Sequence, residues 1–228
     1  KDRQNLANIR KGEYEGMSEK LKLKEWNPDY GSSKFNIKSG VTAIGVREFL
    51  IAYNINLNTS DKKLASDIAL DIREAGRAKR DKNGKIIRDK NNVMVKVPGS
   101  LKAVKAVGWY LNEHNVAQVS MNLVNYKITS VYKAFEEVRQ QAQKRGMRVT
   151  GSELVGLIPL QPLLDAGQYF LKKQNKSEGV TNAQLIHIAV KSLGLDEMYD
   201  FNKNEKIIEY IIDDSPKLVN KTVVSFVD

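Results

Sequence analysis

The chain has 228 residues, of which 41% are hydrophobic and 28% charged; this composition excludes a disordered chain and allows a substantial core. No apolar run approaches the roughly 20 residues that cross a bilayer, and the lack of cysteine excludes disulfides and thiolate chemistry, so we expect a cytoplasmic protein with no membrane partner. The net charge of +10 indicates a surface that attracts anions.

The N-terminal part predicts a short helix, an arm and a loop. Leu6 and Ile9 lie at helical spacing, Gly12 is a typical helix stop, and an extended arm should follow through Trp26 and Pro28. Residues 31–40 are rich in glycine and serine, which leave backbone N–H groups and hydroxyls open to a ligand. The alternative is an ordinary connecting loop.

Two apolar runs follow this loop. Val41–Val46 and Phe49–Leu57 are rich in β-branched and aromatic residues, and only two residues separate them, which predicts a tight hairpin. The second run carries Asn54 and Asn56, which share one face of a strand. The amide pair indicates a ligand-facing strand, or else a solvated edge.

A helix and a basic segment come next. Leu64, Ile68 and Ile72 recur every four residues and predict a helix that packs on the sheet. The segment 77–105 then holds ten basic and two acidic residues, a net +8, and should form an exposed β-ribbon or loop. Its basic residues are Arg77, Lys79, Arg80, Lys82, Lys85, Arg88, Lys90, Lys96, Lys102 and Lys105.

The charge of this segment has three explanations. It could bind nucleic acid, attract a small molecule with several carboxylates, or only keep the protein soluble. The segment holds no aromatic residue on which a base could stack, and no nucleic-acid-binding signature occurs in the chain. A carboxylate-rich small ligand therefore fits the sequence better than nucleic acid.

A second hairpin is predicted around residues 112–115. Its strands are Val104–Leu111 and Val116–Val124, and the second alternates apolar residues with Gln118, Ser120 and Asn122, so one face should be polar. These side chains would extend the polar face begun by the two asparagines of the preceding strand.

The remainder alternates helices with one more strand. Helices are expected at 130–146, 159–170 and 182–194, and the strand at 149–158 contains Glu153. A carboxylate inside an apolar strand needs a partner, which is either a salt bridge or an amine of a ligand. A last helix should begin near Pro216.

The order of elements predicts an α+β fold. Two ββα-type units and a fifth strand would form one mostly antiparallel sheet with helices packed on one face, a two-layer sandwich. The other face would then carry the amides.

No catalytic or metal-binding pattern can be found in the chain. It has no nucleophile motif and no phosphate-binding loop, and its two histidines, His114 and His187, lack partners at metal-ligand spacing. We expect His114 to be exposed in a turn and His187 to lie within a helix, at the boundary of its apolar side, and we expect no metal.

Several stretches together resemble the formiminotransferase half of the formiminotransferase-cyclodeaminase family (glutamate formimidoyltransferase). They occur in family order over nearly the whole chain: IRKGEYEGM, WNPDYG, GVREFLIAYNINLN, IALDIREAGR, GWYLNEHNVAQVSMNL, GSELVGLIPL and KIIEYII. The tail SPKLVNKTVVSFVD resembles the beginning of the cyclodeaminase domain of bifunctional members.

The resemblance implies transfer of the formimino group of N-formimino-L-glutamate to the co-substrate tetrahydrofolate, in histidine degradation. It implies a homodimer that binds folate, including polyglutamylated folate, between two subdomains. On this basis we divide the chain into the end of the N-terminal subdomain with the folate loop (1–38), the C-terminal subdomain (39–213), and the start of a following domain (214–228).

The resemblance also implies which residues bind ligands. The loop that matches the family's folate-binding segment consists of Gly31, Ser32, Ser33, Lys34, Phe35, Asn36, Ile37, Lys38, Ser39 and Gly40. Candidate substrate-facing residues are Asn54, Asn56, Gln118, Ser120, Asn122 and Glu153. No residue matches the family's catalytic histidine, so we expect substrate-binding surface without the catalytic group, most of the N-terminal subdomain being absent. The alternative is a non-catalytic module that binds polyanions or nucleic acid through the basic segment.

Overall fold

The computed structural model describes residue 3 and residues 6–213, and the chain divides into two compact units, Lys1–Arg47 and Glu48–Asp228. The helix predicted from Pro216 lies outside the described residues. Within them, no helix is long and apolar enough to cross a membrane.

The first unit contains three short helices, α1 (Leu6–Ile9), α2 (Glu13–Lys20) and η1 (Lys24–Trp26). The helical part of this unit was predicted to end at Gly12, and this is wrong. Gly12 has a φ of 93° and lies directly before a second helix. The expected extended arm is therefore largely helical. Glycine tolerates the left-handed backbone that reverses the chain between α1 and α2.

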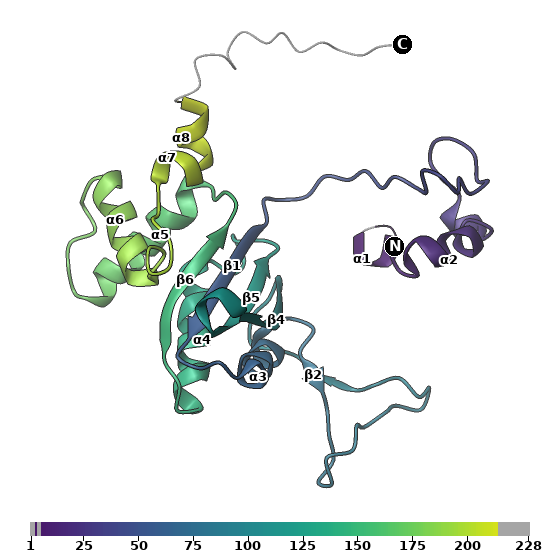
Figure 1. Cartoon of the computed structure of the whole chain (residues 1–228), viewed down its shortest axis with the longest axis horizontal. Helices are drawn as coiled ribbons and strands as arrows, with labels where there is room; N and C mark the ends of the chain where they lie inside the picture. The colour runs from purple at the N-terminus through teal and green to yellow at the C-terminus, as the bar shows by residue number, and fades with distance from the viewer. Residues whose placement is uncertain (1–2, 4–5, 214–228) are drawn as a thin grey trace. The chain divides into compact units, whose positions relative to one another are not determined.

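The second unit is built on a four-stranded antiparallel sheet in the order β4-β5-β1-β6 (Figure 1). Its strands are β1 (Ile51–Leu57), β4 (Val104–Leu111), β5 (Val116–Leu123) and β6 (Val149–Val155). The predicted β4–β5 hairpin is confirmed, and the 3-10 helix η2 (Asn112–His114) closes it.

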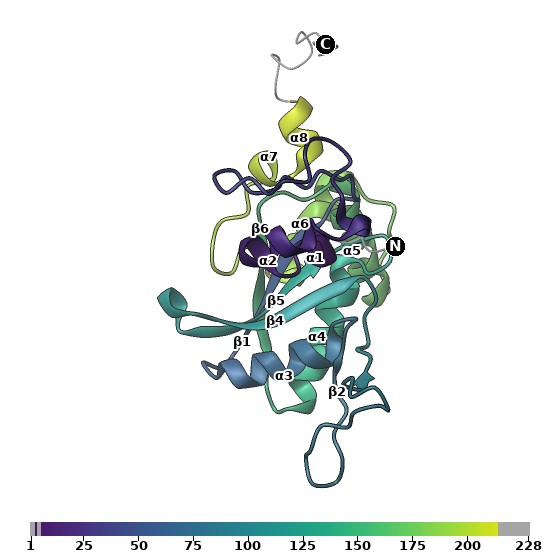
Figure 2. The same ribbon diagram turned by 90° about the vertical axis from the view of Figure 1, so that its right-hand side faces the viewer.

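Two long helices, α3 (Lys62–Ile72) and α4 (Val131–Lys144), cover one face of this sheet (Figure 2). The helix α5 (Leu160–Lys173) packs on α4 and on α6 (Asn182–Leu193). Two short helices follow, α7 (Lys203–Lys206) and α8 (Ile208–Asp213). The predicted fold class, a mostly antiparallel sheet with helices packed on it, is confirmed.

The first predicted hairpin does not exist. Residues 41–50 form neither helix nor strand, Ile44 and Val46 are fully exposed, and β1 begins only at Ile51. The expected two ββα units and fifth strand are therefore wrong: the first predicted ββα unit contributes only the strand β1, and the main sheet has four strands. Residues with high β propensity form a strand only where another strand pairs with them, and β1 pairs with β5 and β6 instead.

The core lies between the sheet and the helices. Every second residue of β1 points into it, and Ile51, Tyr53 and Ile55 are fully buried. The Tyr53 hydroxyl donates a hydrogen bond to Ser152 Oγ at 2.9 Å, and burial raises the pKa of this tyrosine far above its usual range. The polar side chains of the same strand must then face the opposite side of the sheet.

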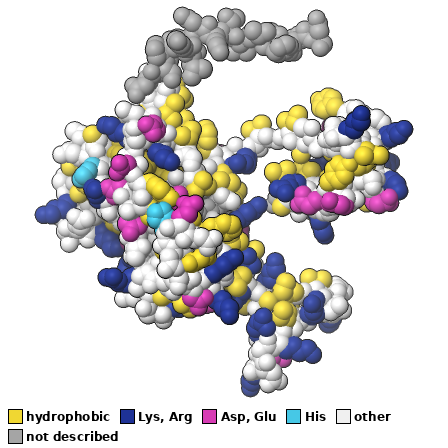
Figure 3. All heavy atoms as spheres, viewed as in Figure 1, with side chains coloured by type: hydrophobic (Ala, Val, Ile, Leu, Met, Phe, Trp, Pro, Cys, Tyr) yellow, Lys and Arg dark blue, Asp and Glu magenta, His cyan; other side chains and the backbone are white. Residues whose placement is uncertain are grey.

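The basic segment forms the expected ribbon, which projects from the second unit (Figures 1 and 3). The short strands β2 (Arg77–Ala78) and β3 (Lys96–Val97) pair as its stem. Beyond the stem three backbone hydrogen bonds close a ring, since Lys79 N donates to Val95 O, Val95 N to Ile87 O, and Ile87 N to Lys79 O. The eight-residue spacing of these positions matches the repeat RDKNG…RDKNN in the sequence.

An ion-pair cluster connects the ribbon to both long helices. Asp67 and Asp71, one turn apart on α3, pair with Arg77 of the ribbon stem and with Arg145 at the end of α4. Burial raises the pKa of Asp67, but the hydrogen bonds and charges of Arg145 and Arg77 outweigh it, so this pKa is lowered overall. The cluster therefore holds three elements together through charge-assisted contacts.

Candidate functional site

The candidate site lies on the face of the sheet that α3 and α4 leave uncovered. The strand registers place the polar residues of three strands side by side. Across β5, β1 and β6 the rows are Gln118–Asn56–Gly151, Ser120–Asn54–Glu153 and Asn122–Ala52–Val155. The six residues predicted to face substrate are thus brought together on one surface, although the register that aligns them was not predicted.

Amide side chains form a network in the first two rows. Gln118 Nε2 donates to Asn56 Oδ1 at 2.8 Å and lies 3.4 Å from Glu153 Oε2, while Asn54 Nδ2 lies 3.3 Å from the same carboxylate oxygen. Gln118 and Asn56 are each only 1% exposed. The network therefore satisfies buried amides and directs their N–H groups towards a carboxylate.

The segment after α6 covers one end of this face. Asn56 Nδ2 donates to Glu197 Oε2 at 3.3 Å and lies 2.9 Å from Met198 Sδ. A Cβ on Gly151 would lie 2.6 Å from Glu197 Cβ, so only glycine at this position lets the segment approach β6 so closely. Gly194, with a φ of 61°, ends α6 and turns the chain into this contact.

A histidine and a tyrosine lie at the edge of the open face, which we call the rim. His114 of η2 lies with its Nε2 2.9 Å from the Tyr199 hydroxyl, and the two rings meet edge to face at 5.4 Å between centroids. Both side chains are exposed, as was expected for His114. The contact links the closed end of the β4–β5 hairpin to the segment after α6.

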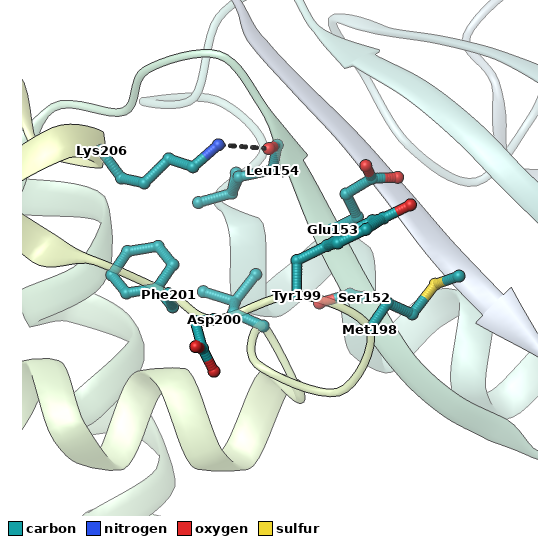
Figure 4. Close-up of a pocket in the computed structure, with 9 residues that line it drawn as sticks. Ser152, Glu153, Leu154, Met198, Tyr199, Asp200, Phe201 and Lys206 are labelled. Carbon is teal, nitrogen blue, oxygen red and sulfur yellow. Dashed lines mark hydrogen bonds between the residues drawn. The ribbon is translucent and has the colours of Figure 1, made fainter.

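A cavity of about 150 Å³ lies beside β6, the edge strand, on the side of the segment 195–206. Figure 4 shows Glu153 on one side of this cavity and Lys206 on another. The cavity is lined by Ser152, Glu153, Leu154, Leu195, Met198, Tyr199, Asp200, Phe201 and Lys206. Lys206 Nζ is directed at the Leu154 carbonyl oxygen, 3.5 Å away, and not at Glu153.

The carboxylate of Glu153 accepts hydrogen bonds from the amides of Asn54 and Gln118, and that of Glu197 from the amide of Asn56. Within the described part of the chain neither carboxylate forms an ion pair, so the salt bridge considered for Glu153 does not occur there. The other partner considered, an amine of a ligand, stays a prediction. The carboxylate of Glu153 is half-buried and keeps acceptor capacity for a further donor.

The loop 31–40 belongs to the first unit and has a defined local structure. The Asn36 side chain accepts hydrogen bonds from Lys38 N (2.9 Å) and Ser39 N (3.1 Å), and Gly40 N donates to Asn36 O. Tyr14 of α2 anchors the loop, because its hydroxyl donates to Ile37 O and its ring packs on Phe35. The loop thus presents exposed serines and lysines from an ordered turn.

Sequence reasoning missed three residues of this surface, Glu197, Met198 and Tyr199. No motif marks them; they reach the sheet because Gly194 and Gly151 allow close backbone approach between segments distant in sequence. His187 lies apart from the sheet, on α6, beside Ala183 and Ile188 in a shallow hollow. Among the described residues no group of three or more His, Cys, Asp or Glu side chains could hold a metal ion.

Comparisons with known proteins show the family to which the chain belongs. Residues 52–213 match the formiminotransferase domain model, and residues 1–47 match the model of the formiminotransferase domain, N-terminal subdomain. The break between the two matches falls where the chain divides into its two compact units.

Curated relatives include two kinds of protein. The mouse formimidoyltransferase-cyclodeaminase is 45% identical over 213 residues, which are 93% of this chain and 36% of that protein. The glutamate formimidoyltransferase of Streptococcus pyogenes is 40% identical over 174 residues, 76% of this chain and 51% of that protein. The chain thus spans about half or less of the length of each relative, and it belongs to the formiminotransferase domain family.

Proposed function

We propose that this chain supplies folate- and substrate-binding surface for a glutamate formimidoyltransferase, which moves the formimino group of N-formimino-L-glutamate to tetrahydrofolate. The observation that carries the proposal is the open sheet face, where an amide network surrounds a carboxylate in a chain that belongs to the formiminotransferase domain family. Asn54 and Gln118 both direct N–H groups at the Glu153 carboxylate, and polar groups that converge in this way are typical of a ligand-binding surface. The division of the chain into subdomains between residues 38 and 39 and between residues 213 and 214 stays a prediction. The homodimer stays a prediction too.

The folate part of the proposal rests on the loop 31–40. Its backbone turn is fixed by Asn36 and Tyr14, so the backbone of residues 36–40 has its shape before any ligand binds. Such preorganisation lowers the entropy lost on binding. We assign this loop to the pteridine, aminobenzoate or glutamate part of the folate, whose polar groups it would contact.

A loop variant should test this assignment. Changing Ser32, Ser33 and Ser39 to alanine should weaken the binding of folinic acid about tenfold or more, since each lost hydrogen bond contributes about 0.5–1.5 kcal/mol. Titration calorimetry on the whole 228-residue chain measures the change.

The matched control is Ser177→Ala. Ser177 Oγ accepts a hydrogen bond from the backbone N–H two residues later, as Ser32 Oγ does, but it lies in the other unit. We expect this control to bind folinic acid as the unmodified chain does. Equal affinity for the loop variant would remove the loop from the folate site.

We further propose that these 228 residues do not turn over substrate alone. Transfer breaks the bond between the formimino carbon and the glutamate nitrogen, so a proton must reach the departing amine, and a positioned acid–base group normally delivers it. Neither histidine of the chain matches the family's catalytic motif, and His114 already contacts Tyr199. Incubation with N-formimino-L-glutamate and tetrahydrofolate should yield no 5-formiminotetrahydrofolate above background, and measurable product would place the acid–base group within this chain.

A further inference from the structure

We propose that Glu153 binds the cationic formimino group of the substrate in the cavity beside β6, and so distinguishes a formimino from a neutral formyl group. This inference rests on the proposed function, because it assigns a role within the same site. It names the substrate group that Glu153 recognises.

The first argument is the charge of Glu153. Its carboxylate is half-buried in the middle row of the open face, yet within residues 6–213 no cation pairs with it. The contacts it has are two amide donors, Asn54 and Gln118, both at 3.3–3.4 Å, the long limit of a hydrogen bond. A half-buried carboxylate of this kind attracts a positive ligand group strongly.

The second argument is the composition of the cavity. Lys206 is the one Lys or Arg among the residues that line it, and its ammonium is directed at the Leu154 carbonyl oxygen. Asp200 lines the cavity and adds a negative charge, and Glu197, which binds Asn56, adds a second one on the same face of the sheet. The Tyr199 ring also lines the cavity, and an aromatic face attracts cations. The surroundings therefore favour a cation and provide space for a small planar group.

The third argument is the chemistry of the ligand. The formimino group together with the glutamate nitrogen is an amidine, which is protonated at neutral pH and presents N–H donors in one plane. A carboxylate accepts such a pair of donors in the bidentate geometry known from arginine. The formyl analogue has a carbonyl oxygen where the amidine has N–H, so it brings no charge and no second N–H donor for the carboxylate to pair with.

A purely structural role is the alternative for Glu153. The carboxylate would then serve only to accept hydrogen bonds from Asn54 and Gln118 and so hold the amide network in place. The variant Glu153→Gln distinguishes the two roles, because its amide oxygen still accepts both bonds while the charge is lost.

The experiment compares two ligands on three proteins. N-formimino-L-glutamate and N-formyl-L-glutamate are titrated by calorimetry into the unmodified 228-residue chain, Glu153→Gln and the control Glu113→Gln, which removes the same charge from the exposed helix η2 at the rim. Thermal melting confirms that each variant is folded.

We expect Glu153→Gln to weaken binding of the formimino ligand about tenfold or more and to leave the formyl ligand within twofold, since only the formimino ligand loses a charge-assisted hydrogen bond. The Glu113→Gln control should preserve the preference for the formimino ligand. Equal losses for both ligands, no loss for either, or a chain that binds neither ligand would each overturn the assignment.

Folinic acid, titrated into the same proteins, separates this inference from the proposed function. If the unmodified chain and Glu153→Gln bind folinic acid equally while the formimino preference is absent from both, the role of Glu153 is wrong and the folate assignment stands. If the unmodified chain binds neither folinic acid nor the formimino ligand, the proposed function itself is wrong.

Discussion

A Gly108→Ala variant should unfold at a temperature several degrees lower than the unmodified chain. Gly108 lies on β4 directly beneath α3, and a Cβ there would lie 2.2 Å from Ser66 Oγ, 2.3 Å from Ser66 N and 2.5 Å from Ser66 Cα. Because two of these atoms belong to the backbone of α3, the helix itself must move. Overpacking of this kind costs about 1–3 kcal/mol of unfolding free energy.

Thermal melting followed by circular dichroism measures the effect, and each 1 kcal/mol corresponds to about 2–4 °C for a domain of this size. The control is Gly45→Ala, where no atom lies within 4 Å of the new Cβ and φ is not positive. An unchanged melting temperature for Gly108→Ala would show that α3 does not pack on β4 as described. The Gly108→Ala variant should leave the polar side chains of the open face in place, because Gly108 lies on the face of the sheet that α3 covers.

The sequence predicted those elements whose signals are local. The capping box at Thr181 and Gln184 marks the start of α6, and the structure shows both of its hydrogen bonds. The β4–β5 hairpin followed from two apolar runs on either side of a polar turn, the second of which alternates with polar residues. In both cases the stabilising contacts join residues that are close along the chain.

The prediction of the first hairpin was wrong because it rested on residue composition alone. Residues 41–46 have the β-branched residues of a strand, but a strand needs a partner, and β1 finds β5 and β6 far along the chain. Propensity reports how well a residue fits a pleated surface and does not state which surface will exist.

The faces of the strands that form the candidate site were predicted from the sequence, but the alignment of those strands was not. Period-two alternation placed Asn54 with Asn56, and Gln118 with Ser120 and Asn122, on common faces. It could not align the two strands, because register between β1 and β5 is set by burial over the whole sheet. Glu197 reaches Asn56 across 141 positions of sequence, and no local pattern encodes such a contact.

An Arg145→Met variant should lose about 1–3 kcal/mol of unfolding free energy at pH 7. Arg145 donates to Asp67 Oδ2 through Nε (2.9 Å) and Nη2 (2.7 Å) and also binds Asp71, so its removal leaves Arg77 as the remaining partner of both carboxylates. Breaking a fully buried pair costs about 3–5 kcal/mol. We expect the smaller loss of about 1–3 kcal/mol, because Asp67 and Asp71 retain 42% and 30% side-chain exposure and water partly screens their charges.

Urea denaturation at two pH values tests this cause directly. The pKa of Asp67 is lowered in the folded chain, so its contribution to stability is present above its unfolded pKa of about 3.9 and is lost as the pH falls through the lower, folded value. The stability difference between Arg145→Met and the unmodified chain should therefore shrink as the pH is lowered from 7 towards 2. The control Lys144→Met removes the same charge from an exposed neighbouring position and should cost little at either pH. A difference for Arg145→Met that stays constant with pH would mean that the arginine stabilises α3 and α4 through packing of its aliphatic stem, and not through the two aspartates.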